Sequence, residues 1–272
     1  MPVIATNTSA NTALIYLNSN SRAQEKSLAK LSSGTRIVRA SDDAAGLAVG
    51  TRLKSNVTVL KQAGINAVQA RSVLQTADGA LSRVGDILQR MKSLAAQSNS
   101  GSVDATARGF INTEFVQLRT EVDAIANATT FNGVALIDGN YNQNFQVGIL
   151  ATDTIVVNIS TVDANIAALG INASQVGTVA NATAASTALD TAINSISTYR
   201  STVGSLLSRF EFRGDVINDA VENLSSAMSA IMDVDIAAEQ STLVSKQVLT
   251  EASIAALGQA NQMKSSLLSL VR

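Results

Sequence analysis

The sequence has 272 residues and is 46% hydrophobic, but only 3% of it is aromatic and it contains no Trp, so small residues must supply most of the packing. The net charge of −1, without a run of Lys or Arg, argues against binding to nucleic acid or to an anionic membrane. Zero Cys excludes a disulfide framework and thiolate metal sites, and zero His removes the commonest general base and metal ligand. The only Pro, Pro2, leaves long helices almost uninterrupted.

The first 31 residues predict a helix with a narrow apolar stripe and no targeting signal. No basic residue precedes Arg22 and no continuous apolar run occurs, so this segment is not a secretory signal peptide. No part of the chain approaches 18 unbroken apolar residues, so we expect no transmembrane span. Gly34 is a plausible left-handed C-terminal cap, and Ser41, Asp42 or Asp43 should cap the next helix. The stripe consists of Ala10, Leu14, Leu17, Ser21, Gln24, Leu28 and Leu31.

The strongest periodic signal runs from Val49 to Ala95. Alternate steps of three and four residues visit fourteen positions, of which only Asn56 is polar. A seven-residue apolar repeat of this length is typical of a helix in a coiled-coil-like bundle. The stripe would be about 70 Å long at 1.5 Å per residue, so an equally long partner must lie against it.

The middle of the chain changes its period. After a loop at residues 98–102, apolar residues at Ile111, Phe115, Leu118, Val122 and Ile125 predict a helix that folds back antiparallel. Residues 131–160 contain Asn-Gly and Asp-Gly turns between β-rich runs, which predicts a β-hairpin region. Residues 161–187 are rich in Ala, Asn, Thr and Gly with little pattern, and we expect a variable surface excursion there.

The partner stripe begins at Leu189 and ends at Ile231, with seven apolar residues at intervals of seven. Arg200 lies in the interleaved set, where it could snorkel to solvent, pair with a carboxylate or contact a neighbouring subunit. A final segment from Ile236 to the end has a weaker stripe that is interrupted by amides such as Gln247 and Asn261.

The predicted fold is mainly α: an elongated antiparallel coiled-coil-like helical bundle with a small β-hairpin region and paired N- and C-terminal helices. The expected domains are the terminal pair, residues 1–42 plus 233–272, and the bundle, residues 43–232. The terminal stripes bury too little apolar surface to offset an ordering cost of roughly 1 to 2 kcal/mol per residue, so we expect these helices to pack against copies of the chain. The residues predicted to mediate polymerisation are Leu14, Leu17, Leu28, Leu31, Leu243, Ile254, Leu257 and Leu268.

Four motifs resemble those of bacterial flagellins. They are KLSSGTRIVRASDDAAGLAV from Lys30, ALSRVGDILQRMKSLAAQS from Ala80, FNGVALIDG from Phe131 and LGQANQMKSSLLSL from Leu257. The resemblance implies the filament subunit of the flagellum, with an inner-tube domain made from the paired termini and without the outer variable domains. Met263 and Lys264 stand where the family often has Pro-Gln, so assembly can differ in detail there.

The resemblance also implies partners and a location. They are other copies of the chain, the flagellar export apparatus and its chaperone, the filament cap and the junction proteins, with secretion to the extracellular flagellum. Hook-filament junction proteins of the same family are the alternative function. Some flagellins carry a zinc protease, but that needs an HExxH-type helix and this chain has no His. No enzymatic activity, cofactor, metal site, nucleic acid or membrane is expected.

The segment from Gln89 to Ala96 resembles the patch through which a vertebrate Toll-like receptor detects flagellin. Arg90, Leu94 and Glu114 match positions that contribute to that recognition. Lys92, Ser93 and Ala96 replace the common Arg, Glu and Val. Because the Ser removes a charged contact, the resemblance predicts weakened recognition.

Overall fold

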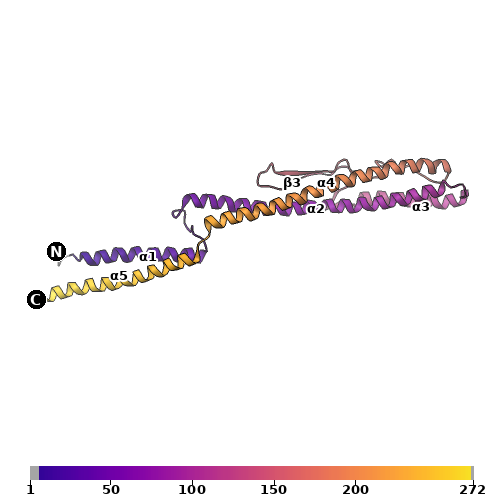
Figure 1. The fold of residues 1–272 in the computed structure, drawn as a ribbon. Coiled ribbons are helices and arrows are strands. Elements are labelled where there is room, and N and C mark those ends of the chain that lie inside the picture. Colours follow the sequence, from indigo (N-terminus) through magenta and orange to yellow (C-terminus); the bar gives the residue numbers. More distant parts are fainter. Residues whose placement is uncertain (1–5, 271–272) are drawn as a thin grey trace. The chain divides into compact units, whose positions relative to one another are not determined.

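The computed structural model describes residues 6–270, with the side chains of residues 267–270 outside the description. The chain is mainly helical, as predicted (Figure 1). Its helices are α1 (Thr8–Ser33), α2 (Ala44–Ser98), α3 (Ala105–Ala128), α4 (Val179–Met232) and α5 (Ile236–Leu270). Its strands form two antiparallel pairs, β1 (Thr130–Phe131) with β2 (Val134–Ala135) and β3 (Asn142–Gln146) with β4 (Thr154–Asn158).

The chain divides into two compact units. One consists of residues 1–56 and 223–272, and the other of residues 57–222. The terminal unit contains α1 and α5, and the bundle unit contains α3, the strands and most of α2 and α4. The domain boundaries predicted from the sequence lie elsewhere, near helix ends at residues 42 and 233. These predicted boundaries remain a prediction.

The bundle unit is held together by the predicted stripes of α2 and α4. Three contacts fix their antiparallel direction: Lys92 pairs with Asp190, Arg200 with Asp78 at 2.9 Å, and Gly64 lies beside Ile217. Every stripe position of α2 from Leu60 to Ala95 is at least 96% buried. The partner stripe of α4 is also buried, at Leu189, Ile196, Val203, Phe210 and Ile217. The long stripe therefore finds its partner within the same chain.

Helix α3 forms the third member of the bundle. It buries Phe115, Val122 and Ala126. The Arg90 guanidinium on α2 donates to Glu114 on α3 at 2.9 and 2.6 Å, and Arg108 donates to the Ser98 carbonyl at 2.8 Å. The later residue of α2, Ser98, contacts the earlier residue of α3, Arg108. Helix α3 is therefore antiparallel to α2, as predicted.

The predicted β region contains two separate hairpins. The Asn132-Gly133 turn joins β1 to β2, and positive φ angles of 50° and 78° at these residues explain the Asn-Gly pair. Strand β3 is fixed to both long helices, since Asn66 donates to the Gln146 carbonyl at 3.0 Å and Arg213 to the Val147 carbonyl at 2.9 Å. The β3–β4 hairpin is thus bonded to both long helices of the bundle.

The expectation of a surface excursion at residues 161–187 is wrong in two respects. Helix α4 already begins at Val179. The preceding segment also buries apolar side chains, namely Val162, Ala164, Leu169, Ile171 and Val176. Irregular backbone has no period, so a composition rich in small residues concealed this contribution to the core.

Candidate functional site

The terminal helices α1 and α5 lie side by side and are capped at defined residues (Figure 1). Asn7 caps α1 by accepting a hydrogen bond from the Ala10 N–H, and its amide donates to the Ala260 carbonyl at 3.0 Å. Gly34 ends α1 with a φ of 70°, the predicted left-handed cap. Asp235 accepts hydrogen bonds from the first N–H groups of α5. The pair is therefore antiparallel, with the start of α1 beside the last turns of α5.

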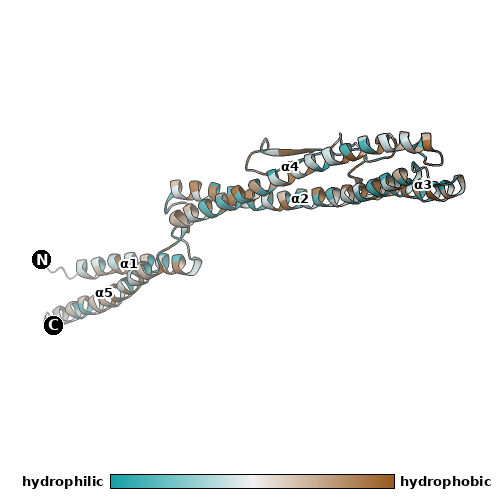
Figure 2. Cartoon of the chain, turned by 45° about the vertical axis from the view of Figure 1, so that its right-hand side comes forward, coloured by the Kyte–Doolittle hydropathy of each residue, from teal (hydrophilic) through white to brown (hydrophobic). Residues whose placement is uncertain are grey.

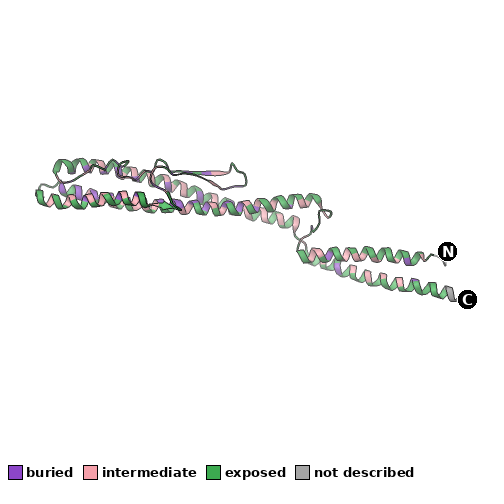
Figure 3. Ribbon diagram, turned by 180° about the vertical axis from the view of Figure 1, so that it is seen from behind, coloured by how far each residue is buried: buried purple, intermediate pink, exposed green. Residues whose placement is uncertain are grey.

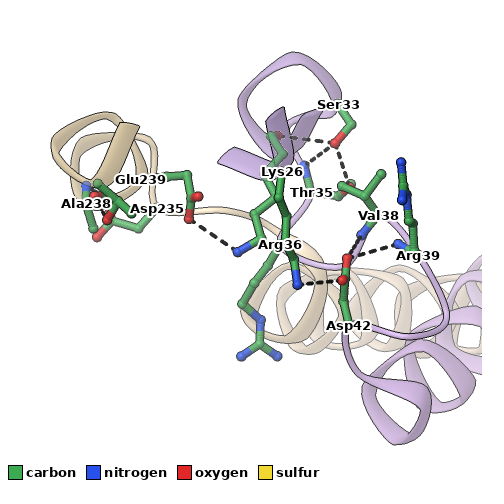
Figure 4. Close-up of polar contacts among 12 residues, drawn as sticks. Lys26, Ser33, Thr35, Arg36, Val38, Arg39, Asp42, Asp235, Ala238 and Glu239 are labelled. Carbon is green, nitrogen blue, oxygen red and sulfur yellow. Dashed lines mark hydrogen bonds and ion pairs between the residues drawn. The ribbon is translucent and has the colours of Figure 1, made fainter. Parts of the chain in front are cut away.

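A polar junction joins α1 to the connector that follows it (Figure 4). The Lys26 ammonium lies 2.7 Å from the Asp42 carboxylate, which also accepts hydrogen bonds from the Val38 and Arg39 N–H groups. The hydrogen bond from Lys26, followed by those from the backbone, lowers the pKa of Asp42 below its usual value. Asp42 is therefore a structural acceptor, while its neighbour Asp43 caps α2 by accepting from the Gly46 N–H at 2.8 Å.

The two connectors of the terminal unit are bonded to each other. The Arg36 N–H donates to the Met232 carbonyl at 2.7 Å, and the Val234 N–H donates to the Gly34 carbonyl at 3.1 Å. Lys30 on α1 reaches Glu239 on α5, with an N–O distance of 3.4 Å. The end of α1 and the start of α5 are consequently held by backbone bonds as well as by charge.

The seam between α1 and α5 is made mainly of small and polar side chains. On α1, Ser21, Ala23, Ala29 and Lys30 are half-buried outside any regular series. The other residues of the two helices that are not exposed are spaced alternately by three and four residues, as in a coiled coil. They are Ala10, Ala13, Leu17, Asn20, Gln24, Ser27 and Leu31 on α1, and Glu239, Leu243, Lys246, Thr250, Ser253, Leu257 and Ala260 on α5. Of these fourteen residues only Ala10, Ser27, Leu243 and Ala260 are buried, with exposed fractions of 4% to 9%. The pair therefore gains little hydrophobic stabilisation from its own seam.

Large apolar side chains of the pair point away from this seam. Figure 2 shows hydrophobic residues along both helices, and Figure 3 shows that most of their surface is exposed. Exposed fractions reach 68% at Ile15, 66% at Ile236 and 59% at both Leu28 and Val248. Other exposed apolar residues are Leu14, Tyr16, Val244, Leu249, Ile254 and Met263. Such a large apolar surface is typical of a protein that associates with a partner.

The residues predicted to mediate polymerisation divide into two groups. Leu14, Leu28 and Ile254 are exposed, whereas Leu17, Leu31, Leu243 and Leu257 belong to the seam. The side chain of Leu268 lies outside the described residues. The sequence prediction missed exposed residues such as Ile15 and Val248. It assigned a single apolar stripe on each helix both to the α1–α5 seam and to the contact with other copies of the chain.

The predicted receptor patch is partly at the surface. Arg90 and Glu114 form the ion pair that joins α2 to α3, and both side chains are about half exposed. Leu94 is 2% exposed, while Lys92 pairs with Asp190. The structure therefore brings Arg90 and Glu114 together and leaves Leu94 in the core.

The described residues show neither a metal-binding cluster nor a helix suited to cross a membrane. Within residues 6–270 no group of three or more acidic side chains is placed to hold a metal ion. None of the helices in that range combines the length and the apolar character that a membrane crossing requires. The fold and the exposed terminal pair define an α-helical, coiled-coil-like protein with apolar side chains exposed on its terminal helices.

Comparison with known proteins identifies the family. Residues 4–142 match the family described as the bacterial flagellin N-terminal helical region, and residues 186–271 match the bacterial flagellin C-terminal helical region. A flagellin of Bacillus subtilis is 38% identical over 300 residues, which cover 98% of both chains. The flagellar filament 33 kDa core protein of Treponema phagedenis is 35% identical, with 99% of this chain and 100% of that protein covered. The chain belongs to the bacterial flagellin family, and it is a short-form filament subunit.

Solved structures agree with this assignment. The crystal structure of Bacillus cereus flagellin has a TM-score of 0.51 and 30% identity, and the match covers 60% of this chain and 94% of that one. A putative flagellar hook-associated protein from Vibrio parahaemolyticus has a TM-score of 0.58, but its 15% identity shows a common fold alone. The alternative of a hook-filament junction protein is therefore not better supported than the filament subunit.

Proposed function

We propose that the chain polymerises through its terminal helix pair and that its role is mechanical rather than enzymatic. The observation that carries this proposal is the distribution of side chains: small and polar residues fill the α1–α5 seam, while large apolar residues such as Ile15 and Val248 are exposed. Packing these faces against other copies would remove them from water, at about 25 cal/mol per Å² of apolar surface buried. A head-to-tail contact that does not close then generates a filament.

The proposal includes secretion to the extracellular flagellum. Subunits would pass unfolded through the flagellar export apparatus, assisted by a chaperone, and refold at the tip under the filament cap, on a base of junction proteins. A small, polar seam supports this route, because separating α1 from α5 exposes little additional apolar surface. The terminal domain at residues 1–42 and 233–272 would form the inner tube, and residues 43–232 the surrounding bundle.

Recognition by the Toll-like receptor would be weakened. The half-exposed Arg90–Glu114 pair is available for such a contact, whereas Leu94 is buried in the free subunit. Lys92 is already paired with Asp190, and Ser93 offers no charge. Full potency of this protein in a receptor reporter-cell assay would contradict weakened recognition.

Charge substitution on α5 tests the polymerisation surface. In Val248→Asp a carboxylate replaces a side chain that is 59% exposed, so the free subunit should fold normally. Seeded polymerisation, followed by sedimentation and negative-stain microscopy, should be lost because the charge would be buried between subunits. Gln247→Glu adds the same charge at the adjacent, already polar position and should still polymerise. Filaments of Val248→Asp at the wild-type critical concentration would refute the proposed surface.

A further inference from the structure

An apolar groove remains open between α2 and α4 in the bundle unit. Its volume is 660 Å³, and all the residues that line it come from these two helices. Within the described chain neither α3 nor a hairpin contributes to its lining, because Glu114 of α3 lies beside Arg90 and α3 ends only fourteen residues later, at Ala128. The groove therefore lies beyond the end of α3, where the bundle has two long helices and no third.

Two glycines open the groove to an incoming side chain. A Cβ added at Gly214 would meet nothing within 4 Å, and one added at Gly64 would only touch Ile217 at 3.6 Å. Ile65 and Val68 are 52% and 60% exposed at its edge. Each glycine costs about 1 kcal/mol relative to Ala inside a helix, and neither has a positive φ angle that would require it. The open space is thus maintained at a cost to helix stability.

A side chain that fits this groove protrudes elsewhere on the same unit. Phe110 on α3 is 73% exposed, the highest fraction for a large apolar residue among those whose burial the structure describes. Its helical neighbours Thr106, Ala107 and Thr113 are small, so the ring projects beyond them. Glu114, one turn further along α3, and Arg90 provide one charge of each sign beside the ring.

The charges around the groove complement those around Phe110. The α2 edge carries Lys61 and Arg71, and the α4 edge carries Glu211 and Asp215. A ring seated between the helices could therefore place Glu114 towards the basic edge and Arg90 towards the acidic edge.

We infer that Phe110 of one subunit inserts into the α2–α4 groove of the next, as a contact between bundle units in the polymer. The inference rests on the proposed function and adds a second interface to it. Phe110 lies between the levels of Arg90 and Ser98, because Glu114 pairs with Arg90 and Arg108 with Ser98. The groove is centred near Gly64, so the two sites are at least about 40 Å apart within one chain at 1.5 Å per helical residue. A ring and a groove that are separated in this way form a head-to-tail contact that does not close on itself.

Filling the groove tests the contact without damage to the fold. In Gly214→Leu the new side chain occupies open space, and the monomer should be at least as stable as wild type because Leu favours helix over Gly. The critical concentration for seeded polymerisation should rise at least tenfold. Gly204→Leu is the matched control, since it makes the same change on α4 with nothing within 4 Å of the new Cβ, outside the groove. A wild-type critical concentration for Gly214→Leu would overturn the inference.

Removing the ring tests the other partner. Phe110→Ala should raise the critical concentration by a similar factor, whereas Phe212→Ala removes an equally exposed ring, 72%, that does not line this groove. Equal effects of the two substitutions would show that general surface hydrophobicity, and not this contact, drives the change.

The absence of Cys from the sequence permits a direct trap. In the double variant Phe110→Cys/Gly214→Cys, mild oxidation should give a reducible ladder of covalent multimers, while each single variant should not. The distance of about 40 Å prevents a disulfide within one chain. The covalent multimers are also measured at high protein concentration without filament seeds. In this way the experiment reports on the contact even if the double variant does not form filaments. If filaments form but no ladder appears, the groove contact is excluded and the proposed function still stands. If the wild-type chain does not polymerise, the proposed function itself is contradicted.

Discussion

At the scale of single residues, Asp42 shows how one carboxylate organises a connector. It accepts hydrogen bonds from Lys26 and from two backbone N–H groups, so its charged form is favoured in the folded chain. A pKa lowered in this way contributes stability above the unfolded-state value of about 3.9, and this stability is lost as the pH falls through the folded value.

Acid should therefore loosen the terminal unit. We expect the free energy of unfolding of monomeric protein, measured by urea titration and circular dichroism, to fall between pH 5 and pH 3. Lys26→Ala should reduce this fall because it removes the largest cause of the pKa shift. Lys264→Ala, an exposed site on α5, serves as the control and should retain the wild-type dependence. An unchanged fall in Lys26→Ala would assign the acid sensitivity to other carboxylates.

Arg200 illustrates what a sequence pattern leaves open. Its position in an apolar stripe allowed three interpretations, and the structure pairs it with Asp78 on α2. The hydrogen bond to Asp78 raises the pKa of Arg200, which keeps it charged. Both side chains remain more than a third exposed, so solvent screening limits the pair to about 0 to 1 kcal/mol. The pair fixes the register of α2 against α4 more than it stabilises them.

At the scale of helices, the stability of the bundle should depend on the centre of α2. Leu81 is fully buried, and Leu81→Asp would place an unpaired charge in the core at a cost of several kcal/mol. We expect a large loss of helical circular dichroism at 25 °C. Gln89→Glu adds a carboxylate at an exposed position of the same helix and should leave the spectrum unchanged. A cooperative, wild-type melt of Leu81→Asp would show that α2 is not the centre of the core.

The sequence predicted the helices of the bundle better than the contact between the terminal helices. In α2 the same residues are both apolar and buried, so the heptad pattern identified the core from Leu60 to Ala95. In α1 the pattern selected Leu14 and Leu28, but the structure buries Ser27 and exposes both leucines. A pattern of apolar residues cannot distinguish a face that packs within the chain from one left for another molecule. The buried part of residues 161–187 was missed for a different reason, since irregular segments bury side chains without any repeat.

At the scale of the whole molecule, the two compact units differ in how their helices are stabilised. The bundle unit has a continuous apolar core, whereas the α1–α5 seam contains few fully buried side chains. Local opening requires less free energy where fewer apolar contacts must be broken.

Amide hydrogen exchange of the monomer should separate the units. We expect residues 8–33 and 236–266 to exchange at least tenfold faster than residues 60–95, because the terminal pair opens without unfolding the bundle. Polymerisation should then slow exchange in the terminal helices more than in the bundle. Equal protection of both units in the monomer would mean that they unfold together.

The small side chains of the α1–α5 seam also affect the dimensions of any tube built from this pair. Six of the fourteen seam residues are Ala, Ser or Thr, and where such residues face each other two helices can approach to an axial separation of about 8 Å, compared with about 10 Å for larger side chains. A wall made of such pairs is thinner, so the same outer diameter encloses a wider bore. In the filament proposed above, which lengthens at its tip, this bore would be the path by which each new subunit arrives. Residues such as Ala13 and Ser253 would then influence growth through the width of that path, although they bind nothing that travels along it.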